Sequence, residues 1–507
     1  MALNSGPYAN RVSSGNNRSG VSYNRTMAEP IRAVLVAAAV CGAFATGCDI
    51  ARQTSSAAAS DPPLAIINVA VIDVGAGTAS AALRSGYTVV VERGVITRVG
   101  PASEVDPPAG SSRVDGRGKY LIPGLWDAHS HLSLAGEAGL LAYVANGVTT
   151  VRDLGSELAK IRRWRTALAS GQLTGPRILT AGPTIEAAWW LDPALELLAK
   201  DPVLAKFPIV EMSPVQRLAS AADAASVIEA VAASGADLVK FRNVRGDEFR
   251  TIADAAMRRG LGLAGHAPAG VPIGEAAERG LRTFEHAETV TARLGDADTT
   301  ARRAQLARVA AAGSAITPTL VTDVAYRQTP DSIAMDAIGD VDGRADARRR
   351  YVDPLLLARW QFGLELKRYE KPADWVERYR RQIADIRLAH EVGVPLLAGT
   401  DLGVSLIYPG FSVHDELKLL VRDAALSPLE ALKAATIHPA RAMRLDDKLG
   451  SIEMGRRGDL VLLTANPLDD VANTTRIDAV VLGGRYFDRT ALDRLLGGAA
   501  GSLRNAR

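Results

Sequence analysis

The chain has 507 residues, enough for one large domain and a smaller one, and its 47% hydrophobic and 23% charged residues are typical of a globular protein. The formal net charge is only +3 and no dense block of Lys or Arg occurs, so we expect no nucleic-acid partner. Both cysteines, Cys41 and Cys48, lie near the N-terminus, so the rest of the chain has neither a disulfide nor a thiolate metal site. Any metal there must be held by histidine, carboxylate or a less usual ligand.

Residues 1–60 are predicted to form an export leader and a flexible tether. An apolar run over residues 33–46 is too short to span a bilayer comfortably and ends in small residues, as secretory signal peptides do. The ATGC sequence at its end resembles the lipobox of bacterial lipoproteins, with Cys48 as the lipidated residue, although Ala45 stands where leucine is usual. A plain signal peptide and a spanning anchor stay as alternatives. We therefore expect an exported protein, either periplasmic or attached to a membrane through a lipid on Cys48.

Short strands separated by glycine turns are predicted in both flanking regions of the main body. They cover residues 65–73, 86–100 and 118–124, and the second of these contains a hairpin turn at Glu92–Gly94. Similar short strands return near the end of the chain. We expect residues 61–122 and 445–507 to build one small β-sandwich together.

Residues 123–444 alternate between short apolar strands and amphipathic helices. Helices are predicted, for example, over residues 224–234 and 248–260. Repeated strand–helix units over about 300 residues indicate a parallel sheet, most economically a closed (β/α)₈ TIM-like barrel. The predicted fold class is therefore α/β, a barrel with a small sandwich beside it.

Potential metal ligands and bases follow five of the predicted barrel strands. The HSH sequence alone fits either a metal-binding pair or an ordinary polar patch, but the whole set is more specific, because active sites of such barrels assemble where the strands end. The set is His129, His131, Lys240, His266, His286 and Asp401.

Lys240 is the unusual member of this set. A lysine within the apolar sequence LVKF would be a costly buried cation unless it is paired or neutralised, or unless it extends outward to solvent. Next to four histidines and an aspartate, an ammonium group would repel a metal ion. The consistent solution is reaction of the amine with CO₂, which gives an anionic carbamate able to bridge two ions roughly 3.5–4 Å apart.

The sequences PGLWDAHSHL, GVTTVRD, VKF, AGH, EH and AGTD, with the tail that begins SPLEALKAATIHPARAM, resemble the amidohydrolase superfamily over roughly residues 62–490. The resemblance is strongest to metal-dependent imidazolonepropionase-like and prolidase-like hydrolases. It implies two divalent ions, usually zinc, bridged by a hydroxide and by the carbamate on Lys240. It implies that Asp401 also acts as the catalytic base and acid. The implied ligands of the first ion are His129, His131 and Asp401, and those of the second are His266 and His286.

Several polar side chains are weaker candidates for contacts with substrate. His414 follows the Asp401 strand on a loop that could face substrate, or it is a polar residue at a helix start. Arg242 and Arg245 could bind a substrate carboxylate or simply be solvated. Other residues have secondary expected roles: Trp189 and Trp190 in a loop that lines an apolar pocket or packs, Arg152 and Asp153 as support for the ligands, and His390 and His438 as structural residues.

The leading functional hypothesis is a binuclear hydrolase that cleaves the C–N bond of a small substrate such as a dipeptide or an N-acyl amino acid. One alternative is a mononuclear imidazolonepropionase or deaminase. The resemblance implies a glutamate three residues after His266 for a deaminase, and HAPAG supplies none, while Lys240 would have no use in either enzyme. A non-catalytic exported binding lipoprotein is a further alternative. Substrate identity stays open, and a homo-oligomer is possible.

Overall fold

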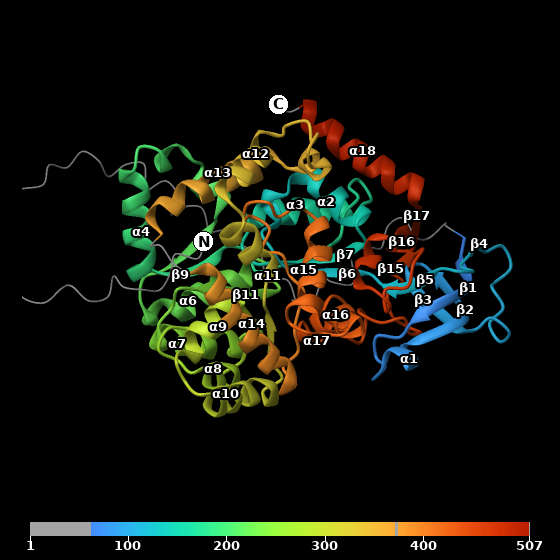
Figure 1. Ribbon diagram of the computed structural model, residues 1–507, viewed down its shortest axis with the longest axis horizontal. Coiled ribbons are helices and arrows are strands. Elements are labelled where there is room, and N and C mark those ends of the chain that lie inside the picture. Colours follow the sequence, from blue (N-terminus) through green and yellow to red (C-terminus); the bar gives the residue numbers. More distant parts are fainter. Residues whose placement is uncertain (1–61, 371–373, 506–507) are drawn as a thin grey trace, which may run out of the picture. The chain divides into compact units, whose positions relative to one another are not determined.

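The computed structural model describes residues 62–370 and 374–505, so the predicted leader with Cys48 lies outside the described residues. Strands from the two ends of this region pair with each other, although they are far apart in the sequence (Figure 1). The strands are β1 (Leu64–Ile72), β2 (Leu83–Glu92), β3 (Val95–Pro101), β4 (Ser112–Asp115), β5 (Tyr120–Pro123), β15 (Leu460–Leu463), β16 (Ile477–Leu482) and β17 (Arg485–Asp488).

The link between the two ends is the antiparallel pair β5–β15, in which Leu460 lies opposite Pro123. One apolar cluster includes buried residues from both ends, among them Ile66, Val89 and Leu462. The hairpin predicted at Glu92–Gly94 is present, and Arg93 and Gly94 have the positive φ angles that a tight two-residue turn requires. Strands of the two ends do pair with each other, but the predicted small sandwich is not confirmed. The strand pairing connects them into a single sheet and does not divide them into the two facing sheets of a sandwich.

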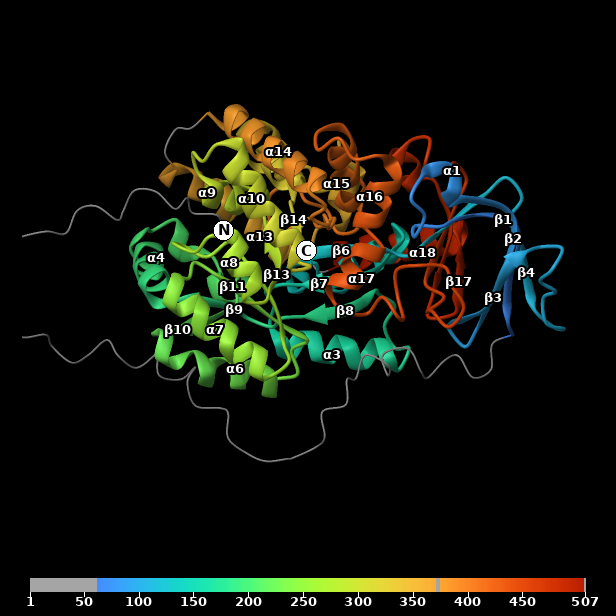
Figure 2. The same cartoon turned by 90° about the horizontal axis from the view of Figure 1, so that it is seen from below.

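Between these strands, the chain forms two parallel sheets with helices on their outside, a TIM-barrel-like α/β arrangement (Figure 2). One sheet has the order β6-β7-β8 and the other the order β10-β9-β11-β12-β13-β14. Their strands are β6 (Leu125–Ser130), β7 (Val148–Asp153), β8 (Arg177–Thr180), β9 (Thr184–Ala187), β10 (Val215–Leu218), β11 (Leu238–Arg242), β12 (Gly262–Gly265), β13 (Leu281–Glu285) and β14 (Ala315–Thr317).

The predicted strand before Asp401 makes one isolated bridge, from Leu396 to Ile316, and Leu402, just after Asp401, makes another to Ser130. Its backbone hydrogen bonds still reach both sheets: Leu397 donates to the carbonyl of Ile316, and Asp401 donates to the carbonyl of His129 over 2.7 Å. The assigned strands therefore do not form a closed ring, but this segment lies between β14 and β6 and brings Asp401 to the end of β6.

The helices predicted at 224–234 and 248–260 are confirmed as α6 and α7. Trp189 and Trp190 were predicted in a loop but lie in the first turn of α4. Further along the chain, a long helical insertion separates β14 from Asp401. Among the residues that the structure describes, no helix is both long and apolar enough to cross a bilayer. The helices are α1 (Ala79–Ala82), α2 (Gly136–Ala145), α3 (Leu158–Ala169), α4 (Ala188–Lys200), α5 (Ile209–Met212), α6 (Ala224–Ala233), α7 (Gly246–Arg258), α8 (Ile273–Glu278), α9 (Ala287–Leu294), α10 (Thr299–Ala311), α11 (Leu320–Thr322), α12 (Asp331–Gly339), α13 (Pro354–Leu366), α14 (Trp375–Glu391), α15 (Phe411–Arg422), α16 (Pro428–Ala434), α17 (Ile437–Ala442) and α18 (Arg489–Asn505).

Candidate metal centre

Three of the predicted ligands meet at the end of β6. One ligand atom each of His129, His131 and Asp401 lies within 4.8 Å of the others, which is close enough for a single metal ion to contact all three. His129 is fully buried on β6, His131 follows that strand, and Asp401 ends the segment that pairs with it. Asp401 has a φ of 52°, which directs the chain sharply away after the carboxylate.

The hydrogen bonds of the two histidines leave a lone pair on the same ring nitrogen in each. Nδ1 of His129 lies 2.8 Å from Oε2 of Glu285, and Nδ1 of His131 lies 3.0 Å from the carbonyl oxygen of Gly155. Both partners accept, so each Nδ1 donates and each neutral ring offers its Nε2 as an acceptor. The Nε2 atoms lie 3.5 Å and 3.0 Å from Oδ1 of Asp401. Either a proton on one ring or a metal ion would relieve the repulsion between these acceptors, and two imidazoles with a carboxylate are a donor set that fits a metal ion.

His266 and His286 extend this cluster from the ends of β12 and β13. The ring centroid of His286 lies 4.7 Å from that of His129 and 4.9 Å from that of His266. Nδ1 of His286 lies 2.8 Å from Oγ1 of Thr319, and that hydroxyl donates to the carbonyl of Pro318. The hydroxyl oxygen therefore accepts from Nδ1, which leaves Nε2 of His286 free to bind a metal. Burial lowers the pKa of both His266 and His286 well below the usual value, which keeps their rings neutral.

Lys240 lies on β11 and is buried, with 2% of its surface exposed. Among the described residues, its Nζ atom has no hydrogen-bond partner. Burial lowers its pKa to about 8, although the carboxylates of Glu285 and Asp401 favour the charged amine. An unpartnered buried amine is costly in a folded protein and needs an explanation. The same amine also acts electrostatically on His129, His266 and His286, so it belongs to the histidine cluster.

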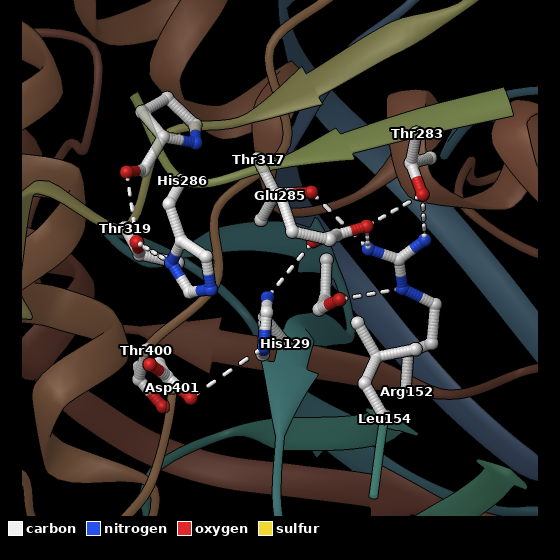
Figure 3. Close-up of polar contacts among 12 residues, drawn as sticks. His129, Arg152, Leu154, Thr283, Glu285, His286, Thr317, Thr319, Thr400 and Asp401 are labelled. Atoms are coloured by element: carbon white, nitrogen blue, oxygen red, sulfur yellow. Dashed lines mark hydrogen bonds and ion pairs between the residues drawn. The ribbon is translucent and has the colours of Figure 1, made fainter. Parts of the chain in front are cut away.

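Arg152 on β7 fixes the carboxylate that orients His129. Its guanidinium donates to Oε1 of Glu285 over 2.8 Å and to the hydroxyl groups of Thr283 and Thr317 over 2.8 Å and 3.1 Å. Figure 3 shows this chain from Arg152 through Glu285 to His129. Burial alone would raise the pKa of Glu285, but Arg152 and His129 hold it well below the usual range. The carboxylate therefore stays ionised and keeps His129 in the tautomer that a metal requires.

Asp127 supports the same strand end from within β6. Its carboxylate accepts from the backbone N–H groups of His129 and Thr400 over 3.2 Å and 3.0 Å, and from the Thr400 hydroxyl over 2.6 Å. Burial raises its pKa to about 6. Gly399 permits the approach, because a Cβ atom there would lie 2.8 Å from the His129 backbone nitrogen. Asp153, predicted as support, accepts from Leu132 N–H over 2.8 Å.

Sequence reasoning gave no role to Asp127 or Glu285. The available signal was position: Asp127 stands two residues before His129 on the same strand, and Glu285 stands directly before His286. Alternation on a strand places Asp127 and His129 on the same face, where a carboxylate can support a ligand. Which histidine Glu285 would contact depends on how β13 lies against β6, and the sequence does not show this.

The structure does not bring His414 to the histidine cluster. It is buried within α15 rather than on a loop, and its ring nitrogens lie 2.9 Å from Oγ1 of Thr474 and 3.1 Å from the carbonyl oxygen of Asn146. Both nitrogens are therefore occupied by contacts that join α15 to neighbouring segments. The geometry gives His414 a packing role and provides no support for contact with substrate.

Arg242 and Arg245 also have partners within the protein. Arg242 is buried at the end of β11, where it forms an ion pair with Glu186 and donates to Oγ of Ser213 over 3.2 Å. Arg245 is exposed, and its guanidinium carbon lies 4.0 Å from the ring centroid of Trp189. Arg242 is close enough to the site to affect Lys240 electrostatically, but Glu186 already balances its charge.

The two histidines that were predicted to be structural lie on helices. Nε2 of His390 on α14 lies 3.2 Å from Oε1 of Glu430. Nδ1 of His438 on α17 donates to the carbonyl of Leu396 over 3.1 Å. Both contacts join elements around the parallel strands, and neither includes a residue of the metal cluster.

The chain is similar to several known proteins over most of its length. The model of the amidohydrolase family matches residues 120–486. An imidazolonepropionase of Salinispora arenicola is 26% identical over 78% of this chain and 90% of its own length, and an ochratoxinase of Aspergillus niger is 23% identical over 80% and 83%. Some matches are short: those to imidazolonepropionases of Thermoplasma acidophilum and Caldanaerobacter subterraneus span 23% and 21% of those proteins.

Solved structures share the fold over most of the chain. A candidate prolidase from Bifidobacterium longum superposes with a TM-score of 0.63 at 25% identity, over 86% of this chain and 99% of the other. A Xaa-Pro dipeptidase with bound methionine superposes with a TM-score of 0.62 at 22% identity, over 84% and 100%. The family match covers well over half of the chain and includes every residue of the cluster at β6, β11, β12 and β13. The chain belongs to the amidohydrolase family.

Proposed function

We propose that this protein is a binuclear metal-dependent hydrolase that cleaves the C–N bond of a dipeptide or an N-acyl amino acid. The observation that carries this proposal is the buried, unpartnered amine of Lys240 beside the histidine cluster. A structural lysine would have an ion-pair partner or reach solvent. An amine that reacts with CO₂ and then binds metal needs neither an ion-pair partner nor access to solvent.

The proposed ligands other than Lys240 form two groups. His129, His131 and Asp401 would hold the first divalent ion, and His266 and His286 would hold the second. Imidazole and carboxylate ligands suit zinc. When bound, such ions lower the pKa of water towards neutrality and polarise a substrate carbonyl.

Lys240 would supply the ligand that the two groups share. The neutral amine attacks the carbon of CO₂: an N–C bond forms, one C–O π bond breaks with its electron pair moving to oxygen, and one proton passes from the nitrogen to water. Compared with the ammonium form of Lys240, the carbamate has a negative charge in place of a positive one. A pKa of about 8 supports this step, because roughly a tenth of such amines are neutral at pH 7, far more than for an unperturbed lysine.

Asp401 would carry the proton during hydrolysis. Asp401 would take a proton from the attacking water and give it to the leaving nitrogen, which must be protonated to depart as an amine. Asp401→Asn should therefore retain metal but lose most turnover, and full activity in that variant would contradict this role.

The direct test counts metal ions and carbamate in the same sample. We expect two equivalents of zinc in protein prepared with bicarbonate and a ¹³C carbamate signal after labelling with ¹³C-bicarbonate. Lys240→Met should lose the signal and at least one zinc, whereas Lys418→Met, a change at an exposed lysine on α15, should lose neither. Zinc-loaded protein is then screened for hydrolysis of Xaa-Pro dipeptides and N-acyl amino acids.

A mononuclear hydrolase acting on a cyclic amide is the second candidate. It is favoured by one observation: among the described residues, His129, His131 and Asp401 are the group whose ligand atoms converge on a single metal position. The Salinispora relative is described as an imidazolonepropionase. One equivalent of zinc without a carbamate signal would support this candidate. No zinc at all would favour a non-catalytic binding protein.

We also propose that the protein is exported and attached to a membrane through a lipid on Cys48. The apolar run before this cysteine supports the proposal. Mass spectrometry of the mature N-terminus in a bacterial host tests it. A diacylated Cys48 that disappears in Cys48→Ser is expected, and an intact leader would contradict export.

A further inference from the structure

Arg359 lies on α13, within the helical insertion between β14 and Asp401. Its side chain is half-buried, and its guanidinium carbon lies 5.5 Å from the ring centroid of Phe362. Its Cγ atom lies 3.9 Å from the position that a Cβ atom would take on Gly403, two residues after Asp401. The insertion therefore brings a cation from outside the barrel strands to the loop that carries a proposed metal ligand.

Apart from the Phe362 ring, the guanidinium of Arg359 has no partner among the described residues. Across residues 62–370 and 374–505, it makes neither a hydrogen bond nor an ion pair. Burial lowers its pKa, and the charge of Asp401 opposes this effect. A guanidinium has five N–H donors and remains charged in proteins. None of the Arg359 nitrogens is among the fully buried unpartnered atoms of the described residues, so these donors stay accessible and can exchange water for the acceptors of a ligand.

The other two arginines that act on this site each have a carboxylate. Arg152 pairs with Glu285, and Arg242 pairs with Glu186. Arg359 acts electrostatically on the same site without such a partner. The positive charge available for an anionic ligand therefore lies on α13 and not on β11, where sequence reasoning had predicted it.

We propose that Arg359 binds a free carboxylate of the substrate and thereby selects acids over the corresponding neutral amides. This inference rests on the proposed hydrolytic function and adds to it the residue that recognises the carboxylate. The planar guanidinium can bind a carboxylate with two parallel hydrogen bonds, a geometry that lysine cannot reproduce. Dipeptides and N-acyl amino acids carry a free carboxylate a few bonds from the scissile C–N bond, whereas their C-terminal amides do not.

The kinetic test compares acids with their amides. Glycyl-L-proline and N-acetyl-L-leucine are assayed beside glycyl-L-prolinamide and N-acetyl-L-leucinamide, using zinc-loaded protein. We expect wild type to prefer the acids, and Arg359→Met to lose about 10- to 100-fold in kcat/KM on the acids alone. Arg359→Lys should recover only part of this loss. Arg380→Met, at an exposed arginine on α14, is the matched control and should change neither substrate pair.

A binding measurement separates this inference from the proposed function. Calorimetric titration of zinc-loaded protein with N-acetyl-L-leucine and with its amide needs no turnover. Binding of the acid that depends on Arg359, without hydrolysis, would support the inference and overturn the proposed function. Hydrolysis with equal values for acid and amide, or an equal loss on both in Arg359→Met, would overturn the inference and leave the hydrolase intact.

Discussion

Replacing Glu285 with glutamine tests how the metal centre is held. In the wild type, Oε1 of Glu285 accepts from Arg152 over 2.8 Å and from the Thr283 hydroxyl over 2.6 Å, and Oε2 accepts from His129 Nδ1 over 2.8 Å. Glutamine has a single acceptor oxygen, so its NH₂ group must face a donor in either orientation. If it faces His129, that ring can accept only by moving its proton to Nε2, the nitrogen proposed to bind the metal.

Two separate losses are expected from Glu285→Gln. Arg152 and Glu285 are almost completely buried, with side-chain exposures of 1% and 0%, and removing one charge of a buried pair typically costs about 3–5 kcal/mol of folding free energy. Zinc affinity should fall about 10- to 100-fold, as it does when the carboxylate behind a ligating histidine is removed. Urea unfolding of metal-free protein measures the first loss, and zinc titration against a competing chelator measures the second.

The matched control is Glu229→Gln, at an ion pair with Arg259 in which both side chains are half exposed. Exposed pairs contribute less than about 1 kcal/mol, so little change is expected. If Glu285→Gln resembles this control in stability and binds zinc like wild type, the proposed orienting role of Glu285 is refuted.

Three further predictions concern other residues around the site. Burial raises the pKa of Glu416 from 4.5 to about 8, so between these values the folded protein holds a proton that the unfolded chain has released. Stability should therefore fall as pH rises through that window, and Glu416→Gln should show a smaller fall in urea unfolding at pH 5 and pH 8. His414→Asn should lose about 1–3 kcal/mol of stability but keep its metal and its kcat/KM, and a folded variant with reduced kcat/KM would restore a substrate role. In Gly399→Ala the new Cβ would press on the backbone of His129, so zinc stoichiometry by elemental analysis should fall; two bound ions would contradict this.

The parallel strands could be predicted from sequence because each is a short apolar run bounded by glycine or polar residues. The segment before Asp401 has the same pattern, yet its backbone makes only isolated bridges, since pairing depends on how closely both neighbours approach. Trp189 and Trp190 were predicted in a loop because α4 begins abruptly after β9, and no capping side chain at Ala187 signals a helix start. The internal proline of α4 adds to that ambiguity.

The metal-binding candidates could be predicted because each follows a strand, and the ends of parallel strands face one region. The side chains that surround and orient these candidates could not be predicted in the same way. Glu285 supports His129 and not His286, its neighbour in sequence, because β13 lies across the cluster from β6. Arg359 belongs to a helix whose sequence carries no recognisable motif, and only the folded chain brings it close to Asp401.

The site cannot hold an ammonium group on Lys240 and two divalent ions at the same time. Without metal, the charged amine is balanced by the carboxylates of Glu285 and Asp401, which favour its protonated form. If metal ions bind, Asp401 becomes a ligand while Glu285 stays paired with Arg152 and His129, and the amine must lose its charge or repel the ions. We therefore infer that zinc loading depends on CO₂: protein reconstituted in bicarbonate-free buffer should take up zinc more weakly than protein reconstituted with bicarbonate. In Lys240→Met the two conditions should give the same uptake, because that side chain has no amine to modify. A bicarbonate effect that persisted in Lys240→Met would show that CO₂ acts at some other group.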